Sequence, residues 1–375
     1  MKVVAALSGG VDSSVAAGLL LEAGHEVLGM TLKLAPDRDG APASQRCCSV
    51  DDAMDARAVC ARLGIPFYVL NAQDLFAEKV IDTFASAYRA GLTPVPCLAC
   101  NVDLKFGHLL QRARAMDARL ATGHYARIVR GAHGPELHTP VDAEKDQTYF
   151  LYGIGLNALE YVDFPVGGMS KREVREHASR LGLPVFDKPD SQEICFVPDD
   201  GHARFVERWD GLGERPGRFV GTEGQVLGQH RGVHTLTVGQ RKGLGIAAGS
   251  RLYVLSVDAS SGDAVVGGPE HLEATGLVAD DAVWLMAPAE RQELGNWDVQ
   301  VRIRARHTPA AARVEVLGDG TGFRVRFREP QRSIAPGQSA VVYRGTRCLG
   351  GGIIRGRLES GTSVAPQVET HQTVT

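Results

Sequence analysis

A short apolar segment that leads into a glycine-rich turn and then a helix is the feature that most constrains the fold of this chain. Residues Lys2–Leu7 have the length and composition of a buried strand, Ser8–Ser14 read Ser-Gly-Gly-Val-Asp-Ser-Ser, and Val15–Ala23 follow a helical pattern. Such a unit directs backbone N–H groups and a helix N-terminus toward an anion. Gly9 and Gly10 let the backbone approach a phosphate, because neither carries a Cβ. The opening of the chain therefore predicts a phosphate-binding loop.

The polar side chains of this loop leave two interpretations open. Ser8, Ser13 and Ser14 supply hydroxyl donors, and Asp12 can orient a pyrophosphate, either directly or through Mg²⁺. Alternatively, Asp12 or Ser13 merely caps an ordinary helix. The common P-loop is excluded, because that motif contains a Gly-Lys pair and this chain contains none. Two glycines, an acid and three hydroxyls behind a buried-type strand favour the phosphate loop.

Strands and helices alternate over the first 125 residues. The predicted strands are 2–7, 27–34, 65–70 and 119–123, and the predicted helices between them are 15–23, 51–63 and 76–89. This alternation indicates βαβ units and a parallel sheet, whose ligands bind at the carboxyl ends of the strands. We therefore expect Gly123-His124-Tyr125 to face the same crevice as the loop, with His124 exposed beside it.

The second half of the chain has a different pattern of residues. Residues 145–205 are helical and loop-rich, with a helix over 171–181 that Ser170 caps. From Gly211, short β-branched runs lie between glycine turns, which indicates one or two small β-barrels. The predicted strands are 251–255, 264–266, 299–306, 312–317, 323–327 and 340–343. The fold class is thus α/β, with a parallel-sheet domain at 1–207, a small β-rich domain at 208–275, a C-terminal β-barrel at 276–357 and a disordered tail at 358–375.

Composition and charge indicate in which cell compartment the protein works and which partners it can bind. The chain of 375 residues is 44% hydrophobic. It has no apolar run of the roughly 20 residues that span a bilayer and no signal peptide, so we expect a cytoplasmic protein whose seven cysteines are not disulfide staples. The net charge of −3 argues against indiscriminate nucleic-acid binding. Locally, however, residues 302–332 hold eight arginines and three acids, a net charge of +5 that predicts a basic face.

A C-x-x-C pair is the second informative feature. Cys97 and Cys100 follow Thr93-Pro94-Val95-Pro96, where two prolines favour an extended approach. A third cysteine, Cys195, lies in a polar loop. Structural zinc usually needs two such pairs, and a thioredoxin-like pair needs a helix N-terminus, which these prolines do not indicate. Cys60 and Cys348 are expected to be inert buried thiols, and no role is predicted for Cys47 and Cys48.

Several motifs together resemble one family. The loop resembles that of the ATP pyrophosphatases (PP-loop proteins), which split ATP between the α and β phosphates and transfer AMP to an oxygen. The wider set of motifs, from Lys2 to about Arg357, resembles the tRNA-specific 2-thiouridylases. These motifs are Thr-Pro-x-Pro-x-x-x-Cys-Asn (93–101), Ala-Thr-Gly-His-Tyr (121–125), Lys-Asp-Gln-Thr-Tyr-Phe-Leu (145–151), Ile-Cys-Phe (194–196), Thr-Val-Gly-Gln-Arg-Lys-Gly-Leu-Gly (237–245) and Pro-Gly-Gln-Ser-Ala (336–340).

The resemblance implies an enzyme that thiolates C2 of the wobble uridine in Lys-, Glu- and Gln-type tRNAs and converts ATP with Mg²⁺ to AMP and diphosphate. Adenylation makes the C2 oxygen a good leaving group, and sulfur then arrives as a soft nucleophile. By resemblance, Cys100 is the catalytic nucleophile and Cys195 carries the persulfide, which a cysteine desulfurase or sulfur-relay protein supplies. The persulfide sulfur attacks C2 either directly or after its release, and Cys100 then resolves the persulfide as a transient Cys100–Cys195 disulfide.

The resemblance also implies binding residues for ATP and tRNA. The residues implied for ATP are Ala6, Leu7, Ser8, Gly9, Gly10, Val11, Asp12, Ser13, Ser14, Leu32 and Gly123. Those implied for tRNA or its target base are Val95, Pro96, Cys97, His124, Lys145, Asp146, Gln147, Arg304, Ala305 and Gln338. The arginine-rich segment around Arg304 independently predicts phosphate contacts, with a solvated strand face as the alternative.

Cys97 departs from the family pattern, in which aspartate is frequent at this position. Three thiolates, Cys97, Cys100 and Cys195, could instead hold an iron–sulfur cluster with one open iron for exogenous sulfur. Two other functions stay open. An amide-forming synthetase of the same superfamily would share the loop but would have no use for the three cysteines. A non-enzymatic tRNA-binding module would have no need for an intact loop.

Overall fold

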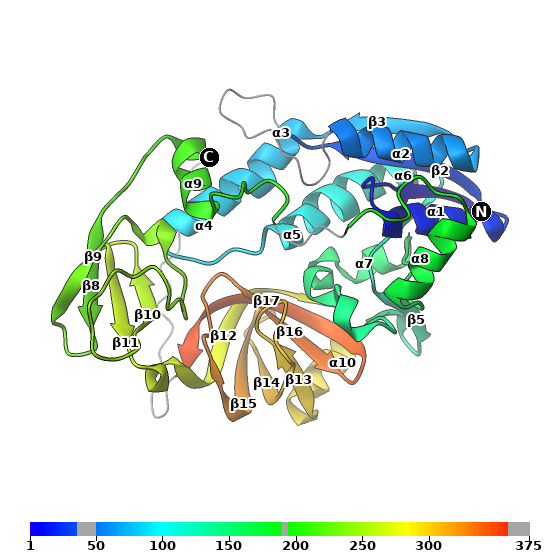
Figure 1. Cartoon of the computed structure of the whole chain (residues 1–375). Helices are drawn as coiled ribbons and strands as arrows, with labels where there is room; N and C mark the ends of the chain where they lie inside the picture. Colours follow the sequence, from blue (N-terminus) through cyan, green and yellow to red (C-terminus); the bar gives the residue numbers. More distant parts are fainter. Residues whose placement is uncertain (36–49, 190–193, 359–375) are drawn as a thin grey trace, which may run out of the picture.

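The computed structural model of the chain describes residues 1–35, 50–189 and 194–358 (Figure 1). Cys47 and Cys48, and the predicted tail apart from Leu358, lie outside the described residues. No helix among the described residues is long and apolar enough to cross a membrane.

A five-stranded parallel sheet forms the first part of the protein. Its spatial order is β3 (Phe67–Asn71), β2 (Glu26–Lys33), β1 (Lys2–Ala6), β4 (Arg119–Thr122) and β7 (Val162–Asp163). Residue Ala6 pairs with Met30 on one side and with Thr122 on the other, so the carboxyl ends of β1, β2 and β4 lie level. Six consecutive residues of β2 are buried, as expected for a parallel strand covered on both faces. The predicted parallel sheet is confirmed.

Helices surround this sheet and continue into the following segment. They are α1 (Val11–Glu22), α2 (Val50–Leu63), α3 (Gln73–Phe76), α4 (Thr83–Arg89), α5 (Pro96–Ala99), α6 (Leu110–Ala115), α7 (Leu156–Leu159), α8 (Lys171–Arg180) and α9 (His202–Asp210). Wide-turn π-helical segments, η1 (Ala77–Asp82) and η2 (Cys100–Leu109), join α3 to α4 and α5 to α6, and short 3₁₀ turns are η3 (Ala143–Lys145), η4 (Thr148–Phe150) and η5 (Tyr152–Ile154). Ser170 caps α8 with a complete capping box, as predicted.

Two β structures follow. The central sheet has the order β10 (Tyr253–Asp258), β11 (Asp263–Gly267), β8 (Gly217–Gly221) and β9 (Val226–His230), with the 3₁₀ turns η6 (Val233–Thr235) and η7 (Pro269–Leu272) nearby in sequence. The barrel has the order β12 (Glu273–Trp284), β15 (Gly322–Arg332), β14 (Ala310–Leu317), β13 (Val299–Arg302), β16 (Ser339–Arg344) and β17 (Arg347–Leu358), and a β12–β17 pairing closes it. Between β12 and β13 lie α10 (Pro288–Glu293) and η8 (Leu294–Asn296).

The barrel is continuous with the first part of the chain. A hairpin from that part, β5 (Arg127–Gly131) and β6 (Gly134–His138), pairs with β17 and extends the barrel sheet. Buried Tyr343 and Cys348 of the barrel belong to the same hydrophobic core as Tyr149 and Tyr152. The sequence did not predict this hairpin, whose pairing with β17 connects the barrel to the parallel-sheet part.

The structure corrects the length of one predicted strand and does not test the predicted domain bounds. The strand predicted over 299–306 ends at Arg302, and residues 303–306 turn away from the sheet. The predicted boundary after residue 207 falls inside α9, and the one after 275 falls inside β12. The domain bounds therefore stay a prediction.

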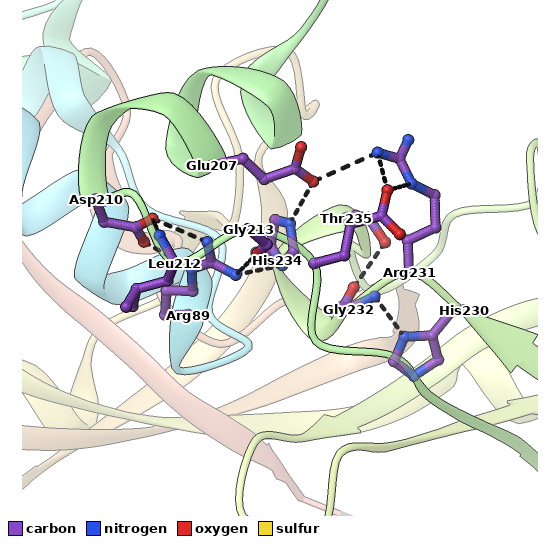
Figure 2. Close-up of polar contacts among 11 residues, drawn as sticks. Arg89, Glu207, Asp210, Leu212, Gly213, His230, Arg231, Gly232, His234 and Thr235 are labelled. Carbon is purple, nitrogen blue, oxygen red and sulfur yellow. Dashed lines mark hydrogen bonds and ion pairs between the residues drawn. The ribbon is translucent and has the colours of Figure 1, made fainter.

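A partly buried ionic network joins the parallel-sheet part to the central sheet (Figure 2). Arg89, at the end of α4, donates to both carboxylate oxygens of Asp210 in α9, at 2.7 and 2.9 Å. It also donates to the Gly213 carbonyl and to Nδ1 of His234, at 2.9 and 3.1 Å. Because His234 Nδ1 accepts from Arg89, Nε2 carries the proton and donates to Glu207 at 2.9 Å. One arginine thereby fixes α9 and the start of the central part against α4.

Candidate active site

The loop between β1 and α1 depends on glycine at residue 9. Gly9 has φ +71°, and a Cβ at this position would lie 2.4 Å from the Asp52 carbonyl oxygen. Any other residue would push α2 away from the loop. The N-cap of α1 is Gly10, which makes no side-chain cap hydrogen bond. The alternative in which Asp12 or Ser13 merely caps the helix is therefore wrong.

The serines of the loop have unequal roles. The Ser13 hydroxyl accepts from the Ser8 N–H at 3.2 Å and donates to the Gly10 carbonyl at 3.1 Å. The Ser14 hydroxyl donates to the same carbonyl at 2.8 Å. Ser13 and Ser14 are buried, whereas Ser8 is exposed. Ser13 and Ser14 thus hold the loop closed, and Ser8 alone of the three presents its side chain to solvent.

The end of β4 lies directly against the loop. A Cβ on Gly123 would lie 2.3 Å from the backbone nitrogen of Ser13, so only glycine fits between them. Leu32, at the carboxyl end of neighbouring β2, is 6% exposed. Ala6 ends β1, and the N–H of Leu7, which follows it, donates to the Met30 carbonyl of β2. The strand-end residues predicted to bind ATP are thus brought together, and their contact with ATP stays a prediction.

We expect the Gly123→Ala variant to bind ATP at least about tenfold more weakly than the wild type. An extra methyl group forced into a well-packed site costs about 1–3 kcal/mol. The Cβ would displace the first turn of α1, which offers the phosphate-binding N–H groups. Isothermal titration with ATP measures the loss. Gly168→Ala is the matched control, since a Cβ there meets nothing within 4 Å. Equal ATP affinity in both variants would contradict the tight packing at Gly123.

Asp12 accepts from two partners that the sequence did not predict. The Lys171 ammonium lies 2.6 Å and the Tyr125 hydroxyl 3.0 Å from the same oxygen, Oδ1. On the other side of the loop, the Lys188 ammonium contacts the Gly9 carbonyl at 3.1 Å, Asp52 at 2.8 Å and Asp55 at 2.6 Å. Two lysines from distant parts of the chain therefore flank the loop.

The C-x-x-C pair lies at the start of a helix, which corrects the expectation that the prolines before it do not make a helix N-terminus. Residues 92–95 before this helix are non-helical, in line with the predicted extended approach. Pro96 is the first residue of α5, where its lack of an N–H costs nothing, and α5 continues directly into η2. Cys97 lies in the first turn and is exposed, and Cys100 is half-buried one turn later. A helix N-terminus favours the thiolate form of a nearby cysteine.

Cys195 is positioned by the phenylalanine that follows it. The Phe196 ring packs edge-on against Phe76 and Phe84, with centroids 5.7 and 5.1 Å apart, and against Phe205 at 5.2 Å. Cys195 is half-buried, and both it and Cys100 pack against the hydrophobic core that contains these rings. Two cysteines nearly one hundred residues apart in sequence therefore border the same core.

The metal and cluster predictions have no ligand set among the described residues. No three His, Cys, Asp or Glu side chains of residues 1–35, 50–189 and 194–358 are grouped to hold a metal ion. Cys97, Cys100 and Cys195 are thus not arranged as cluster ligands in this structure. Mg²⁺ needs fewer protein ligands than a cluster, because it binds one or two carboxylates and completes its coordination shell with substrate phosphates and water. Asp12 suits that role.

Two other cysteines are buried, as predicted. Cys60 is 1% exposed and Cys348 is fully buried. Burial raises the pKa of the Cys60 thiol to about 11 and that of the Cys348 thiol to about 12. In the folded protein at pH 7.5, we expect iodoacetamide to modify exposed Cys97 and spare these two, because the thiolate is the reactive form. Mass spectrometry of digests checks this, and rapid labelling of Cys60 without denaturant would contradict it.

Three protein-family models match successive parts of the chain. They are a tRNA methyl transferase HUP domain (residues 1–199), a tRNA methyl transferase PRC-barrel domain (204–268) and an aminomethyltransferase beta-barrel domain (274–354). A tRNA-specific 2-thiouridylase MnmA of Geobacter metallireducens is 47% identical over 366 residues, which cover 96% of this chain and 98% of that protein. Its namesake in Heliobacterium modesticaldum is 46% identical and covers 94% of this chain and 92% of its own. The chain belongs to the tRNA-specific 2-thiouridylase family.

The family resemblance predicted from the motifs is thereby confirmed, and so is the fold class of parallel-sheet domain, β-rich middle part and C-terminal barrel. The HUP-domain match also places residues 1–199 in an ATP-binding PP-loop family.

Within this 2-thiouridylase, His124 is not exposed as predicted but half-buried. Its Nδ1 lies 2.7 Å from the Thr122 hydroxyl and its Nε2 lies 3.5 Å from the Lys105 ammonium. Burial, together with the Lys105 charge, holds the pKa of His124 well below its ordinary value, so the ring is neutral. Lys105 also donates to Asn101, which follows Cys100, at 3.0 Å. Polar contacts through Lys105 thus connect His124 to the helix that carries Cys97 and Cys100. The contact of His124 with tRNA stays a prediction.

The segment 145–147 is partly committed to internal contacts in this 2-thiouridylase. The Asp146 side chain is only 4% exposed, forms an ion pair with Arg302 at 2.9 Å and accepts from the Thr148 hydroxyl at 2.6 Å. The Gln147 side chain accepts from the Tyr125 N–H at 2.8 Å. These contacts favour a structural role for Asp146, which links the barrel to the parallel-sheet part. Lys145 is half-buried.

The basic face is weaker than the local sequence suggested. Acids outside the counted span neutralise several arginines: Asp298 pairs with Arg313 and Arg328, and Glu273 pairs with Arg332. Arg304, which is exposed in the turn after β13, donates to the Arg332 carbonyl at 3.2 Å, and Ala305 follows it. Charge complementarity to phosphate is therefore confined to a part of this surface.

The barrel loop that contains Gln338 holds the approach to the cysteine helix. Gln338 Nε2 donates to the Thr93 carbonyl at 3.1 Å, and the Thr93 N–H donates to the Pro336 carbonyl at 2.8 Å. Gly337 has φ +90°, and a Cβ there would lie 2.8 Å from the Thr93 nitrogen. The barrel therefore positions Val95 and Pro96, and through them Cys97 and Cys100.

Proposed function

We propose that this chain is a cytoplasmic tRNA-uridine 2-sulfurtransferase that uses ATP to thiolate the wobble uridine of tRNA. In the first step, the uridine C2 oxygen attacks the α-phosphorus, the bond to the β-phosphate breaks and diphosphate leaves. The backbone N–H groups at the start of α1 bind the phosphates. Mg²⁺, held by Asp12, would supply charge neutralisation there.

In the second step, the terminal sulfur of a Cys195 persulfide bonds to C2. The Cys100 thiolate then attacks Sγ of Cys195, the persulfide S–S bond breaks, and its electron pair forms the C2 thiocarbonyl as AMP departs. The products are 2-thiouridine, AMP and a Cys100–Cys195 disulfide, which an external thiol must reduce. A cysteine desulfurase or a sulfur-relay protein supplies the sulfur.

The observation that carries this proposal is the coexistence of a closed phosphate loop with two half-buried cysteines on one core. An amide-forming PP-loop synthetase would use the loop but not the cysteines, and a tRNA-binding module would use neither. The iron–sulfur version of the same thiolation would require Cys97, Cys100 and Cys195 to come together, because no group of three metal ligands is present among the described residues. Iron counting and absorption spectra after anaerobic purification test it, and a colourless, iron-free, fully active enzyme would exclude it.

Thionucleoside analysis of total tRNA tests the function itself. Cells that lack this protein should lose 2-thiouridine at the wobble position, and re-expression of the gene should restore it. Unchanged 2-thiouridine in the deletion strain would refute the proposal.

A further inference from the structure

Lys171 is placed against the phosphate loop from a separate part of the chain. It is the first residue of α8, and its N–H donates to Asp142 at 2.9 Å, beside the Ser170 capping box. Its ammonium lies 2.6 Å from Asp12 Oδ1, and its side chain is only 13% exposed. Asp12 is the second residue of α1, so this ammonium lies at the positively polarised end of that helix.

Two positive features therefore meet at one point. A lysine near a helix N-terminus is unfavourable on its own, because the N–H groups there already carry partial positive charge. The Asp12 carboxylate offsets this cost, and the Tyr125 hydroxyl fixes Oδ1 at 3.0 Å. Any phosphate bound to the first-turn N–H groups would lie close to the Lys171 ammonium.

Lys188, the other lysine of the loop, serves a different purpose. Its ammonium contacts Gly9 and the carboxylates of Asp52 and Asp55, which together fix the loop to α2. Lys188 therefore holds the backbone in position, whereas Lys171 contacts Asp12, the acid in the first turn of α1.

We propose that Lys171 is a catalytic residue that binds the diphosphate portion of ATP and stabilises it as it leaves. This inference rests on the proposed function, in which the bond between the α-phosphorus and the β-phosphate oxygen breaks and the electron pair stays on diphosphate. Negative charge therefore grows on the β-phosphate. A lysine ammonium is a compact point charge on a flexible stem, so it can follow the leaving group as it separates.

The test compares Lys171→Met and Lys171→Arg with Arg172→Met. Arg172 is the adjacent residue of α8, but its ion pair with Glu176 is exposed, so it controls for changes in this helix. Inorganic diphosphate and AMP, each with Mg²⁺, serve as inhibitors, and tRNA-dependent AMP formation is followed in parallel. Thermal unfolding reports on folding.

The Lys171→Met variant should bind diphosphate about tenfold or more weakly and form AMP more slowly, with AMP binding and melting temperature unchanged. Lys171→Arg should recover part of the loss, and Arg172→Met should match the wild type. Unchanged diphosphate binding in Lys171→Met, or an equal loss for AMP and diphosphate, would overturn the inference. Failure of the proposed function would give a different result. The wild-type protein would then form no AMP with tRNA, while the Lys171→Met variant would still bind diphosphate more weakly than the wild type.

Discussion

Replacing Cys100 with serine is expected to abolish thiolation of tRNA, lowering its rate by about three orders of magnitude or more. A serine hydroxyl cannot attack Sγ of Cys195, so the reaction should stop after the sulfur has bonded to C2. The variant should therefore accumulate a covalent tRNA–protein adduct through Cys195 that dithiothreitol releases. Gel electrophoresis with and without dithiothreitol, together with thionucleoside analysis, measures both effects.

The Cys195→Ser variant should be equally inactive but should form no adduct, because it has no sulfur to transfer. Both variants should bind tRNA nearly as the wild type does, since neither side chain is expected to contribute much to affinity. Cys97→Ser separates the two thiolation mechanisms. It should retain Cys195-dependent sulfur transfer if a persulfide is used, and it should lose activity together with iron if a cluster is used. Thiolation that persists in Cys100→Ser or Cys195→Ser would contradict the assigned roles.

Replacing Arg89 with methionine should destabilise the protein by about 2 kcal/mol, because it removes two hydrogen bonds to a charged, partly buried carboxylate. The Arg89 and Asp210 side chains are only 12% and 18% exposed, and Arg89 also supports Gly213 and His234 (Figure 2). Chemical denaturation measures the free energy of unfolding. Arg208→Met is the control in α9, the helix that also carries Asp210. Its pair with Asp200 is far more exposed, and exposed ion pairs contribute little to stability.

The difference between wild type and Arg89→Met should depend on pH. Burial opposes ionisation of Asp210, but hydrogen bonds from Arg89 and the Leu212 N–H outweigh it and keep the pKa of Asp210 below its ordinary value of 3.8. The stabilisation is therefore fully present above the unfolded-state pKa and is lost as the pH falls through the lower, folded-state pKa. Unfolding curves at pH 7 and near pH 3 measure the change. A difference that is equal at both pH values would contradict the charge-based explanation.

The phosphate loop and the parallel sheet could be predicted from sequence because local rules govern them. The strand, the glycines and α1 are adjacent in the chain, and alternation of strands and helices leaves few topologies. Gly9 and Gly123 illustrate the limit of such rules. The sequence marked both positions, but only the packed structure shows that the backbone atoms of Asp52 and Ser13 exclude a side chain there.

The features that the sequence did not predict are long-range pairings. Lys171 reaches Asp12 across 159 residues and Arg302 reaches Asp146 across the boundary of the barrel. No periodicity marks such partners, because each is a single charged residue in an otherwise ordinary segment. The arginine-rich span shows the converse error, since a count over residues 302–332 omits the acids at 273 and 298 that neutralise it.

The most direct test of the account is transfer of labelled sulfur in a single turnover. Purified protein with a radiolabelled persulfide on Cys195 would be mixed with ATP, Mg²⁺ and tRNA from a strain lacking this gene. The account predicts that label appears as 2-thiouridine at the wobble position, with one AMP formed per sulfur transferred and a Cys100–Cys195 disulfide left behind. Label that stays on the protein while AMP forms, or label transferred without ATP, would contradict it.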